Sequence, residues 1–299
     1  MKKDLLTLRD LTRNDWENIL DLSLKLKRER GKVEYTPLKG KSIGLIFAKS
    51  STRTRVSFEV GVSELGGQPL YLDQGKMQIG RGETIADTAN VLSRYLHGIV
   101  IRTYSQAEIE ELARVATIPI INALTDDYHP CQMLADMMTI YEHSGKLDKS
   151  IKVAFYGDGR SNIANSLMLA SQLGDFELVV SSPEKYIEAV ATGLTNVTWE
   201  PDPIKAAKDV DYFYTDVWVS MGFEEEREQR MKMFAPYQVN EALFAVAKKD
   251  AKFLHCLPAH RGEEVSAGIM DDPNRSIVFD EAENRLHAQK ALMSLLIGK

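Results

Sequence analysis

The feature that most constrains this chain is a regular alternation of short apolar runs with segments of helical periodicity. Strands that alternate with helices in this way predict parallel sheets built from right-handed crossover units. A short polar stretch at residues 144–150 separates two such series. We expect strands at residues 42–47, 69–72, 98–101 and 118–123 in the first series, and at 151–157, 177–182, 211–218, 253–258 and 276–280 in the second.

The length of the chain indicates two domains. It has 299 residues, and single hydrophobic cores stop growing near about 250 to 300 residues. We predict a first domain over residues 1–145 and a second over residues 146–280. The segment from about 281 to 299 has the pattern of an amphipathic helix that returns to pack on the first domain. The predicted fold class is therefore α/β, with two doubly wound domains that each contain a central parallel sheet.

Charge and cysteine content exclude several classes of protein. Lys and Arg number 37 against 43 Asp and Glu, and this net charge of −6 argues against broad binding to nucleic acid or an anionic membrane. The two cysteines, Cys131 and Cys256, form no Cys-x-x-Cys pair, so neither a disulfide framework nor a local zinc site is expected. No apolar stretch approaches about 18 residues, and no signal-peptide core is present. We expect a cytoplasmic protein without a metal.

A cluster of hydroxyl and guanidinium groups, Ser51 to Arg55, follows the first predicted strand of the chain. Ligands of open parallel sheets bind beyond the carboxyl ends of the strands. Backbone N–H groups at a helix start favour an anion, and hydroxyls beside a guanidinium fork suit a phosphate. In the alternative interpretation, Ser51 or Thr52 only caps the helix and both arginines make surface ion pairs.

The predicted strand at residues 151–157 ends at Gly157. The sequence Gly157-Asp158-Gly159 at this end resembles the start of a dinucleotide-binding fingerprint. Asn162 occupies the place of the third glycine, and no acidic residue follows the next strand to hold a ribose hydroxyl. A tight turn, with a small carboxylate bound at the helix start, therefore fits better than NAD. Asp216 is a candidate acceptor for an ammonium group, and its simpler interpretation is a capping or turn aspartate.

Three other segments have simple structural interpretations. His255 and Cys256 are adjacent on an extended chain, so their side chains point to opposite faces and form no direct base–nucleophile pair. His129 precedes Pro130 at a helix start, either as a donor to a polarised oxygen or as a packed loop residue. The glutamate-rich run at residues 224–230 predicts a solvated helix face.

Taken together, these segments resemble the carbamoyltransferase family, and within it the ornithine branch. Residues 47–59 resemble the family's Ser-Thr-Arg-Thr-Arg phosphate loop, and residues 129–136 its His-Pro-x-Gln element. Residues 216–222 resemble the Asp-x-x-x-Ser-Met-Gly loop of the ornithine branch, and residues 253–265 its His-Cys-Leu-Pro loop. Residues 280–291 complete a match that spans nearly the whole chain in order.

The resemblance implies a carbamoyl-phosphate site in the first domain and an ornithine site in the second, with a cis bond before Pro258. The residues implied to bind carbamoyl phosphate are Ser51, Thr52, Arg53, Thr54, Gln78, Arg102, His129, Pro130, Cys131, Gln132, Cys256, Leu257 and Arg285. Those implied to bind ornithine are Asn162, Asp216, Ser220 and Met221. The implied catalytic set is Arg102, His129, Cys256, Asp216 and Thr54, of which Arg102, His129 and Thr54 would stabilise the carbonyl oxygen.

The implied reaction transfers the carbamoyl group of carbamoyl phosphate to the δ-amino group of L-ornithine, giving L-citrulline and phosphate in arginine biosynthesis. The carbamoyl group arrives activated, so the reaction requires no metal or organic cofactor. Family members assemble as trimers, and Gln78 would reach a neighbouring subunit's site. The expected partners are the two small-molecule substrates and further copies of the chain, as a homotrimer or a multiple of trimers, with no nucleic acid or membrane.

Several competing functions remain at this stage. An aspartate carbamoyltransferase shares the phosphate loop but needs a cationic pocket for a dicarboxylate, and the Ser-Met-Gly loop argues against it. Putrescine or acetylornithine as the amine would require small changes in that loop. An NAD-dependent oxidoreductase is disfavoured by the missing glycine and the missing ribose-binding acid. A non-catalytic module would bind phosphate without turnover.

Overall fold

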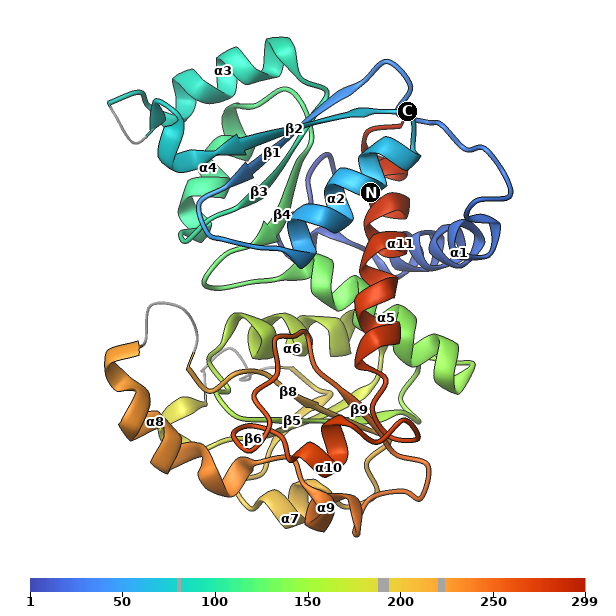
Figure 1. The fold of residues 1–299 in the computed structure, drawn as a ribbon, viewed down its shortest axis with the longest axis vertical. Coiled ribbons are helices and arrows are strands. Elements are labelled where there is room, and N and C mark those ends of the chain that lie inside the picture. Colours follow the sequence, from blue (N-terminus) through green and yellow to red (C-terminus); the bar gives the residue numbers. More distant parts are fainter. Residues whose placement is uncertain (80–81, 188–193, 220–223, 299) are drawn as a thin grey trace. The chain divides into compact units, whose positions relative to one another are not determined.

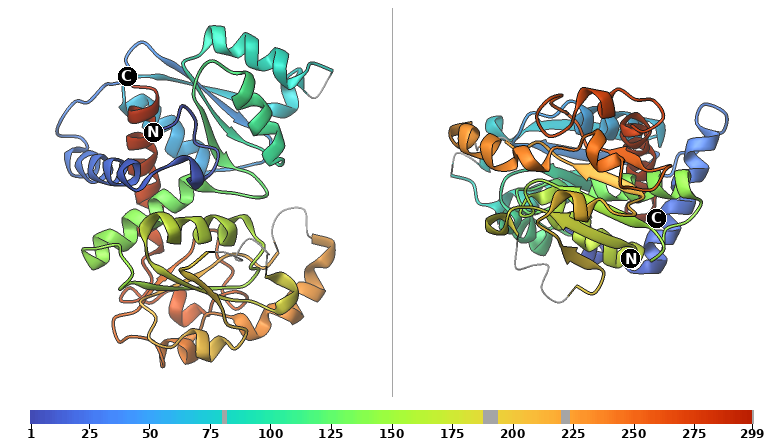
Figure 2. Two further views of the ribbon diagram at one scale, coloured as in Figure 1. Left: turned by 180° about the vertical axis from the view of Figure 1, so that it is seen from behind. Right: turned by 90° about the horizontal axis from the view of Figure 1, so that it is seen from below.

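The computed structural model describes residues 1–79, 82–187, 194–219 and 224–298. The chain divides into two compact units, unit 1 with Met1–Met138 and Glu283–Lys299, and unit 2 with Thr139–Ala282. Both ends of the chain lie in unit 1 (Figure 2). The division falls inside helix α5 (Pro130–Ser144), ahead of the polar stretch at residues 144–150. The polar stretch therefore follows the end of α5, whereas the boundary between the two compact units lies inside this helix.

Unit 1 contains a four-stranded parallel sheet with the order β2-β1-β3-β4. The central strands β1 and β3 are continuous apolar runs, as expected for strands covered on both faces. The strands are β1 (Ser42–Phe47), β2 (Gln68–Asp73), β3 (Gly98–Arg102) and β4 (Ile120–Leu124). The helices, besides the first part of α5, are η1 (Leu8–Asp10), α1 (Arg13–Glu29), α2 (Arg53–Glu64), η2 (Gln74–Lys76), α3 (Ile85–Tyr95), α4 (Gln106–Val115) and most of α11 (Val278–Leu296).

The helices of unit 1 cover its sheet in two groups. The chain steps from β1 to β2 and then returns past β1 to β3 and β4. Because parallel crossovers are right-handed, α2 lies on one face, and α3 and α4 lie on the other. Helix α11 packs on α2 at Gly61, where an added Cβ would lie 3.2 Å from Met293 Cε. The C-terminal helix therefore packs on the first half of the chain, as the sequence predicts.

Unit 2 contains a five-stranded parallel sheet with the order β7-β6-β5-β8-β9. In Figure 1, helix α6 lies on one side of this sheet, and α7 and α9 lie on the other. The strands are β5 (Lys152–Tyr156), β6 (Glu177–Ser181), β7 (Val197–Trp199), β8 (Tyr212–Thr215) and β9 (Lys252–Leu254). The helices are α6 (Asn162–Gly174), η4 (Glu184–Tyr186), α7 (Pro203–Ala206), η6 (Glu224–Glu226), α8 (Arg227–Phe234), η7 (Ala235–Tyr237), α9 (Glu241–Phe244) and α10 (Ala267–Met270).

In unit 2, one predicted strand is absent from the described residues and one observed strand was not predicted. Residues 276–280 do not form a strand, since Ser276 makes only an isolated bridge with Phe253 and helix α11 begins at Val278. A short buried apolar run does not by itself distinguish a strand from a helix start. Strand β7 was not predicted, because it has only three residues and its side chains are largely exposed.

In both sheets the strand order reverses beside the first strand of the unit. This reversal lies between β1 and β3 in unit 1, and between β5 and β8 in unit 2. In open parallel sheets, ligands bind at such a reversal, beyond the carboxyl ends of the strands. Within the described ranges, no helix combines the length and the apolar character needed to cross a membrane.

Candidate active site

The loop after β1 leads into the N-terminus of α2, where Ser51, Thr52 and Arg53 lie. Thr52 is the N-cap residue, and its side chain makes no capping hydrogen bond. Thr52 and Arg53 are exposed, and Ser51 is half-buried. A helix start presents N–H groups and the positive end of the helix dipole. This geometry fits an anion site better than the alternative in which Thr52 serves only as a cap.

Arg55 forms a surface ion pair, as the alternative interpretation of this motif predicts. Its Nε lies 2.9 Å from Glu59 Oε1, four residues along the same helix. Its Cζ lies 3.8 Å from the centroid of the Tyr71 ring on β2. The two arginines of the motif therefore differ, because Arg55 is occupied by its neighbours and Arg53 lies at the helix start.

Thr54 and Arg285 come together from distant parts of the sequence. Arg285, on α11, donates from Nη2 to Thr54 Oγ1 over 2.6 Å, and both side chains are buried. A hydroxyl has two acceptor lone pairs and one proton. Because Thr54 accepts from Arg285, its own proton can be donated to a ligand oxygen.

His129 and Arg102 lie in the same unit, at the start of α5 and the end of β3. Both are largely buried, with 4% and 9% of their surface exposed. Burial lowers the pKa of His129 well below its ordinary value, and the charges of Arg285 and Arg102 lower it further. His129 is therefore neutral near pH 7, and a neutral imidazole still carries one N–H donor.

The residues that follow His129 make contacts within unit 1. The thiol of Cys131 donates to the carbonyl oxygen of Asn122 on β4 over 3.2 Å. Burial raises the pKa of this thiol to about 12, although Arg285 opposes the rise. Gln132 donates from Nε2 to Asp136 Oδ1 over 2.8 Å. The Cys131 side chain is thus packed in the core of unit 1, and Pro130 is buried beside it.

Gln78 lies in the loop after η2. Its side chain is exposed, and its backbone carbonyl oxygen accepts from the backbone N–H of Glu83 over 3.2 Å. Residues 80 and 81 of the same loop fall outside the described residues.

In unit 2, three predicted residues follow neighbouring strands. Asn162 is the first residue of α6, whose N-cap is Ser161. Cys256 donates from Sγ to Asp216 Oδ1 over 3.3 Å, which joins the ends of β8 and β9. Asp216 Oδ1 also accepts from the Val217 N–H over 2.8 Å, so the turn interpretation describes part of its role. Burial raises the pKa of Asp216, and nearby His255 opposes this rise.

His255 supports the loop that carries Cys256. Its Nδ1 accepts from the Leu257 N–H over 2.9 Å, and its Nε2 lies 3.2 Å from Glu264 Oε1. Because Nδ1 accepts, Nε2 is the ring nitrogen that can donate to Glu264. The backbone N–H of His255 donates to Glu281 Oε2 over 2.8 Å. The contacts of Glu264 and Glu281 were not predicted, because both glutamates lie inside matched motifs but no role follows from their spacing to His255.

The same loop has an unusual backbone. Leu257 adopts a left-handed conformation with φ of 60°, and the Leu257–Pro258 bond is cis, as the resemblance implies. Left-handed non-glycine residues persist where the surroundings over-determine them and cluster at functional sites. Ligand atoms of Asp216, His255 and Cys256 lie within 4.8 Å of one another. A metal there would displace a bond that His255 already makes. Ser220 and Met221 lie outside the described residues.

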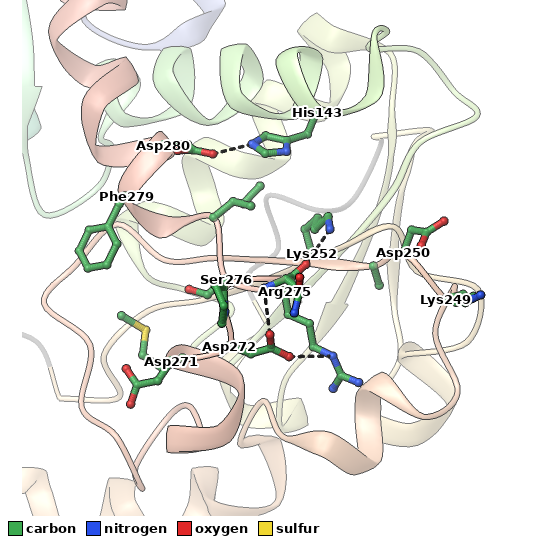
Figure 3. A pocket seen from close by; sticks show the side chains of 15 residues that line it. His143, Lys249, Asp250, Lys252, Asp271, Asp272, Arg275, Ser276, Phe279 and Asp280 are labelled. Carbon is green, nitrogen blue, oxygen red and sulfur yellow. Dashed lines mark hydrogen bonds and ion pairs between the residues drawn. The ribbon is translucent and has the colours of Figure 1, made fainter.

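A cavity of about 700 Å³ also opens on unit 2, and none of the predicted site residues lines it (Figure 3). His143 Nε2 lies 2.8 Å from Asp280 Oδ2 along its wall. Arg275 Nε lies 3.5 Å from Asp272 Oδ2. The lining also includes Lys249, Asp250, Lys252 and Asp271, so it carries side chains of both charges.

Comparison with known proteins identifies the family. Residues 3–142 match the family model described as aspartate/ornithine carbamoyltransferase, carbamoyl-P binding domain. Residues 149–296 match the model of the Asp/Orn binding domain. The chain is 52% identical to an ornithine carbamoyltransferase of Syntrophus aciditrophicus, over 99% of this chain and 100% of that protein. It is 51% identical to the ornithine carbamoyltransferase of Bacillus subtilis, over 99% and 94%.

Solved structures agree with the sequence matches. The structure is similar to ornithine carbamoyltransferase from Pyrococcus furiosus, with a TM-score of 0.92 and 48% identity over 99% of this chain and 97% of that chain. For the Thermus thermophilus enzyme the TM-score is 0.90, with 40% identity over 99% of each chain. The chain therefore belongs to the aspartate/ornithine carbamoyltransferase family.

Proposed function

We propose that this protein transfers the carbamoyl group of carbamoyl phosphate to the δ-amino group of L-ornithine, giving L-citrulline and phosphate. The observation that carries the choice of amine is Asp216, a half-buried carboxylate at the end of β8 that contacts Cys256. A carboxylate is a natural partner for the α-ammonium group of an amino acid. Aspartate carries a second carboxylate, which a carboxylate of the protein would repel. A site for aspartate would therefore need a cation at this position.

Carbamoyl phosphate is proposed to bind in unit 1. Its phosphate would lie at the N-terminus of α2, where Ser51, Thr52 and Arg53 combine hydroxyls, N–H groups and a guanidinium. Charge-assisted hydrogen bonds of this kind contribute roughly 1.5 to 3 kcal/mol each, so one local cluster can hold a phosphate on an acidic protein. Arg285 supports this cluster through its bond to Thr54.

The proposed chemistry depends on donors aimed at the carbonyl oxygen. The neutral δ-amino nitrogen attacks the carbonyl carbon, negative charge develops on the oxygen, and phosphate leaves with the amine's proton. Arg102, the N–H of neutral His129 and the Thr54 hydroxyl are the proposed donors. Each preorganised donor is worth about 3 to 4 kcal/mol in the transition state. A neutral imidazole has the further advantage that it does not protonate the attacking amine.

Ornithine is proposed to bind through residues of unit 2. Asn162 is at the start of α6, where a neutral amide and the helix N-terminus suit the α-carboxylate. Asp216 would accept from the α-ammonium group, and Cys256 beside it would face the reacting carbamoyl group together with Leu257. Ser220 and Met221 are carried over from the family motif as further ornithine-binding residues.

We also propose a homotrimer, or a multiple of trimers, with Gln78 completing a neighbouring subunit's site. Unit 1 exposes large apolar side chains, among them Tyr95 (71% exposed), Val56 and Tyr71, as an association surface would. The proposed setting is arginine biosynthesis in the cytoplasm, and both cysteines are free thiols, which fits a reducing compartment.

A comparison of amines tests the proposed role of Asp216. Putrescine has the reacting amino group of ornithine but lacks its α-carbon substituents. We expect the wild-type protein to prefer ornithine strongly in kcat/KM, and Asp216→Asn to reduce that preference by about tenfold or more. An unchanged ratio between ornithine and putrescine in the Asp216→Asn protein would remove Asp216 from the ornithine site.

A further inference from the structure

Arg230 is an exception among the charged residues of helix α8, because the others are exposed. The sequence of residues 224–230 predicts a solvated helix face, and Arg227, Glu228 and Gln229 are indeed exposed. Arg230 is only 4% exposed. A buried arginine requires partners for its charge and its N–H groups, so its contacts identify what it holds in place.

The guanidinium of Arg230 joins two separate segments of unit 2. Its Nη2 donates to the carboxylate of Asp158, in the loop after β5. Its Nε donates to the backbone carbonyl oxygen of Trp218 over 2.5 Å, in the segment after β8. Its Cζ lies 5.2 Å from the centroid of the Tyr186 ring and 5.3 Å from that of Phe234. These rings fix the plane of the guanidinium between the two segments.

Both segments carry residues proposed to bind ornithine. Asp158 lies four positions before Asn162 in the sequence, and its Oδ1 accepts from the Arg160 N–H over 2.9 Å. Trp218 lies two positions after Asp216. The segments also approach each other at Gly157, where φ is 125° and an added Cβ would lie 3.5 Å from Trp218 Cδ1.

We infer that Arg230 is a positioning residue for the amino-acid substrate, because it ties the loop of Asn162 to the segment of Asp216. The inference rests on the proposed function. A guanidinium donates in fixed directions from nitrogen atoms that lie apart in one plane, whereas the donors of a lysine all leave one compact ammonium group, which does not reproduce this geometry. Removal of Arg230 leaves the half-buried carboxylate of Asp158, whose side chain is 15% exposed, without this cation, and both segments then shift. Arg230 lies beside these segments and acts on the substrate through them.

The test measures KM for each substrate separately in Arg230→Met, Arg230→Lys and a matched control, Arg227→Met. Arg227 is on the same helix and also pairs with a carboxylate, that of Glu263, but its side chain is 51% exposed. For Arg230→Met we expect KM for ornithine to rise about tenfold or more, with KM for carbamoyl phosphate and kcat at saturating ornithine within about threefold of wild type. Arg230→Lys should fall between wild type and Arg230→Met, and Arg227→Met should match wild type.

A second readout separates positioning from chemistry. L-norvaline keeps the α-carboxylate and α-amino group of ornithine and lacks the δ-amino group, so it binds without reacting. Its dissociation constant, measured by calorimetry with carbamoyl phosphate present, should rise in Arg230→Met by the same factor as KM for ornithine. Equal losses for both substrates, or an unchanged KM for ornithine in a folded Arg230→Met protein, would overturn the inference.

A double-mutant cycle keeps the inference testable if Arg230→Met does not fold. Asp158→Asn retains the side-chain volume and removes the charge that Arg230 pairs with. Asp158→Asn and Arg230→Lys should each raise KM for ornithine, and the double variant should be no worse than the more impaired single variant. If the increase in KM for ornithine in the double variant were the product of the two single increases, the two residues would act independently, which would contradict the inference. If the wild-type protein makes no citrulline, the proposed function fails; if it does and these variants leave KM for ornithine unchanged, only the role of Arg230 fails.

Discussion

Arg285 donates to the hydroxyl of Thr54 over 2.6 Å, although 231 positions separate the two residues in the sequence. The bond joins the C-terminal helix to the first turn of α2, next to the exposed residues Thr52 and Arg53. It also sets the direction of the Thr54 proton, because the hydroxyl oxygen is already an acceptor. A local motif after β1 therefore depends on a side chain from the other end of the chain.

Thr54→Val removes this hydroxyl with little change in volume. We expect kcat to fall by about 10² to 10³, because one of the proposed donors to the developing negative charge is lost. Stability should fall by about 1 to 3 kcal/mol, since Arg285 loses a buried acceptor. Steady-state kinetics and urea unfolding measure the two effects.

Thr88→Val is the matched control for that variant. Thr88 is also a buried threonine on a helix of unit 1, and its Oγ1 has no hydrogen-bond partner among the described residues. We expect normal kcat and no loss of stability. A similar fall in kcat for both valine variants would show that Thr54 acts through packing.

Arg53→Ala should weaken binding of carbamoyl phosphate and leave the fold intact. Arg53 is exposed at the start of α2, so its loss removes charge from the proposed anion site without opening the core. We expect KM for carbamoyl phosphate to rise by about tenfold or more, which is the loss of about one charge-assisted bond. Arg13→Ala, which breaks the exposed Arg13–Glu17 pair on α1, is the control. Retained affinity in Arg53→Ala would remove this loop from the site.

His287 should make the folded state sensitive to acid. Its ring is fully buried on α11, with Glu283 Oε1 3.5 Å from Nε2. Burial lowers its pKa to about 4, with Glu283 opposing and Lys27 and Lys290 adding to the shift. The unfolded chain takes up this proton near pH 6.5, so the free energy of unfolding falls as pH drops from 6.5 towards 4 and then levels off.

His287→Leu removes that proton uptake and keeps an apolar side chain in the core. We expect urea unfolding of this variant to show a shallower decline between pH 6.5 and 4 than the wild-type protein, by up to about 3 kcal/mol. His129 contributes in the same direction and remains in both proteins. An identical pH dependence in the two proteins would contradict this role of His287.

The two cysteines should react differently with iodoacetamide. Cys131 is 1% exposed and its pKa is raised to about 12, so almost no thiolate is present near pH 7. Cys256 is partly exposed and contacts Asp216. Peptide mass spectrometry should find the modification on Cys256 alone in the folded protein, and L-norvaline with carbamoyl phosphate should slow it. Equal rates at the two cysteines would contradict the burial of Cys131.

The parts of the fold that were predicted correctly are those that follow from local patterns. Apolar runs and helical periodicity are readable within a few residues, and the polar residues at strand ends follow from the topology of parallel sheets. Arg230 was assigned to a solvated face because its neighbours are charged. Its burial depends on Asp158, 72 positions away, which no local pattern contains. The Cys131 contact to Asn122 likewise depends on how α5 packs on β4.

The central claim is the choice of ornithine as carbamoyl acceptor. The most direct test supplies ¹³C-labelled carbamoyl phosphate with an equimolar mixture of ornithine, aspartate, putrescine and acetylornithine, and identifies the labelled products by mass spectrometry. The account predicts that the label enters citrulline ahead of every other carbamoylated amine, together with stoichiometric phosphate. Label appearing first in carbamoyl-aspartate, carbamoyl-putrescine or acetylcitrulline, or phosphate released without any carbamoylated amine, would contradict it.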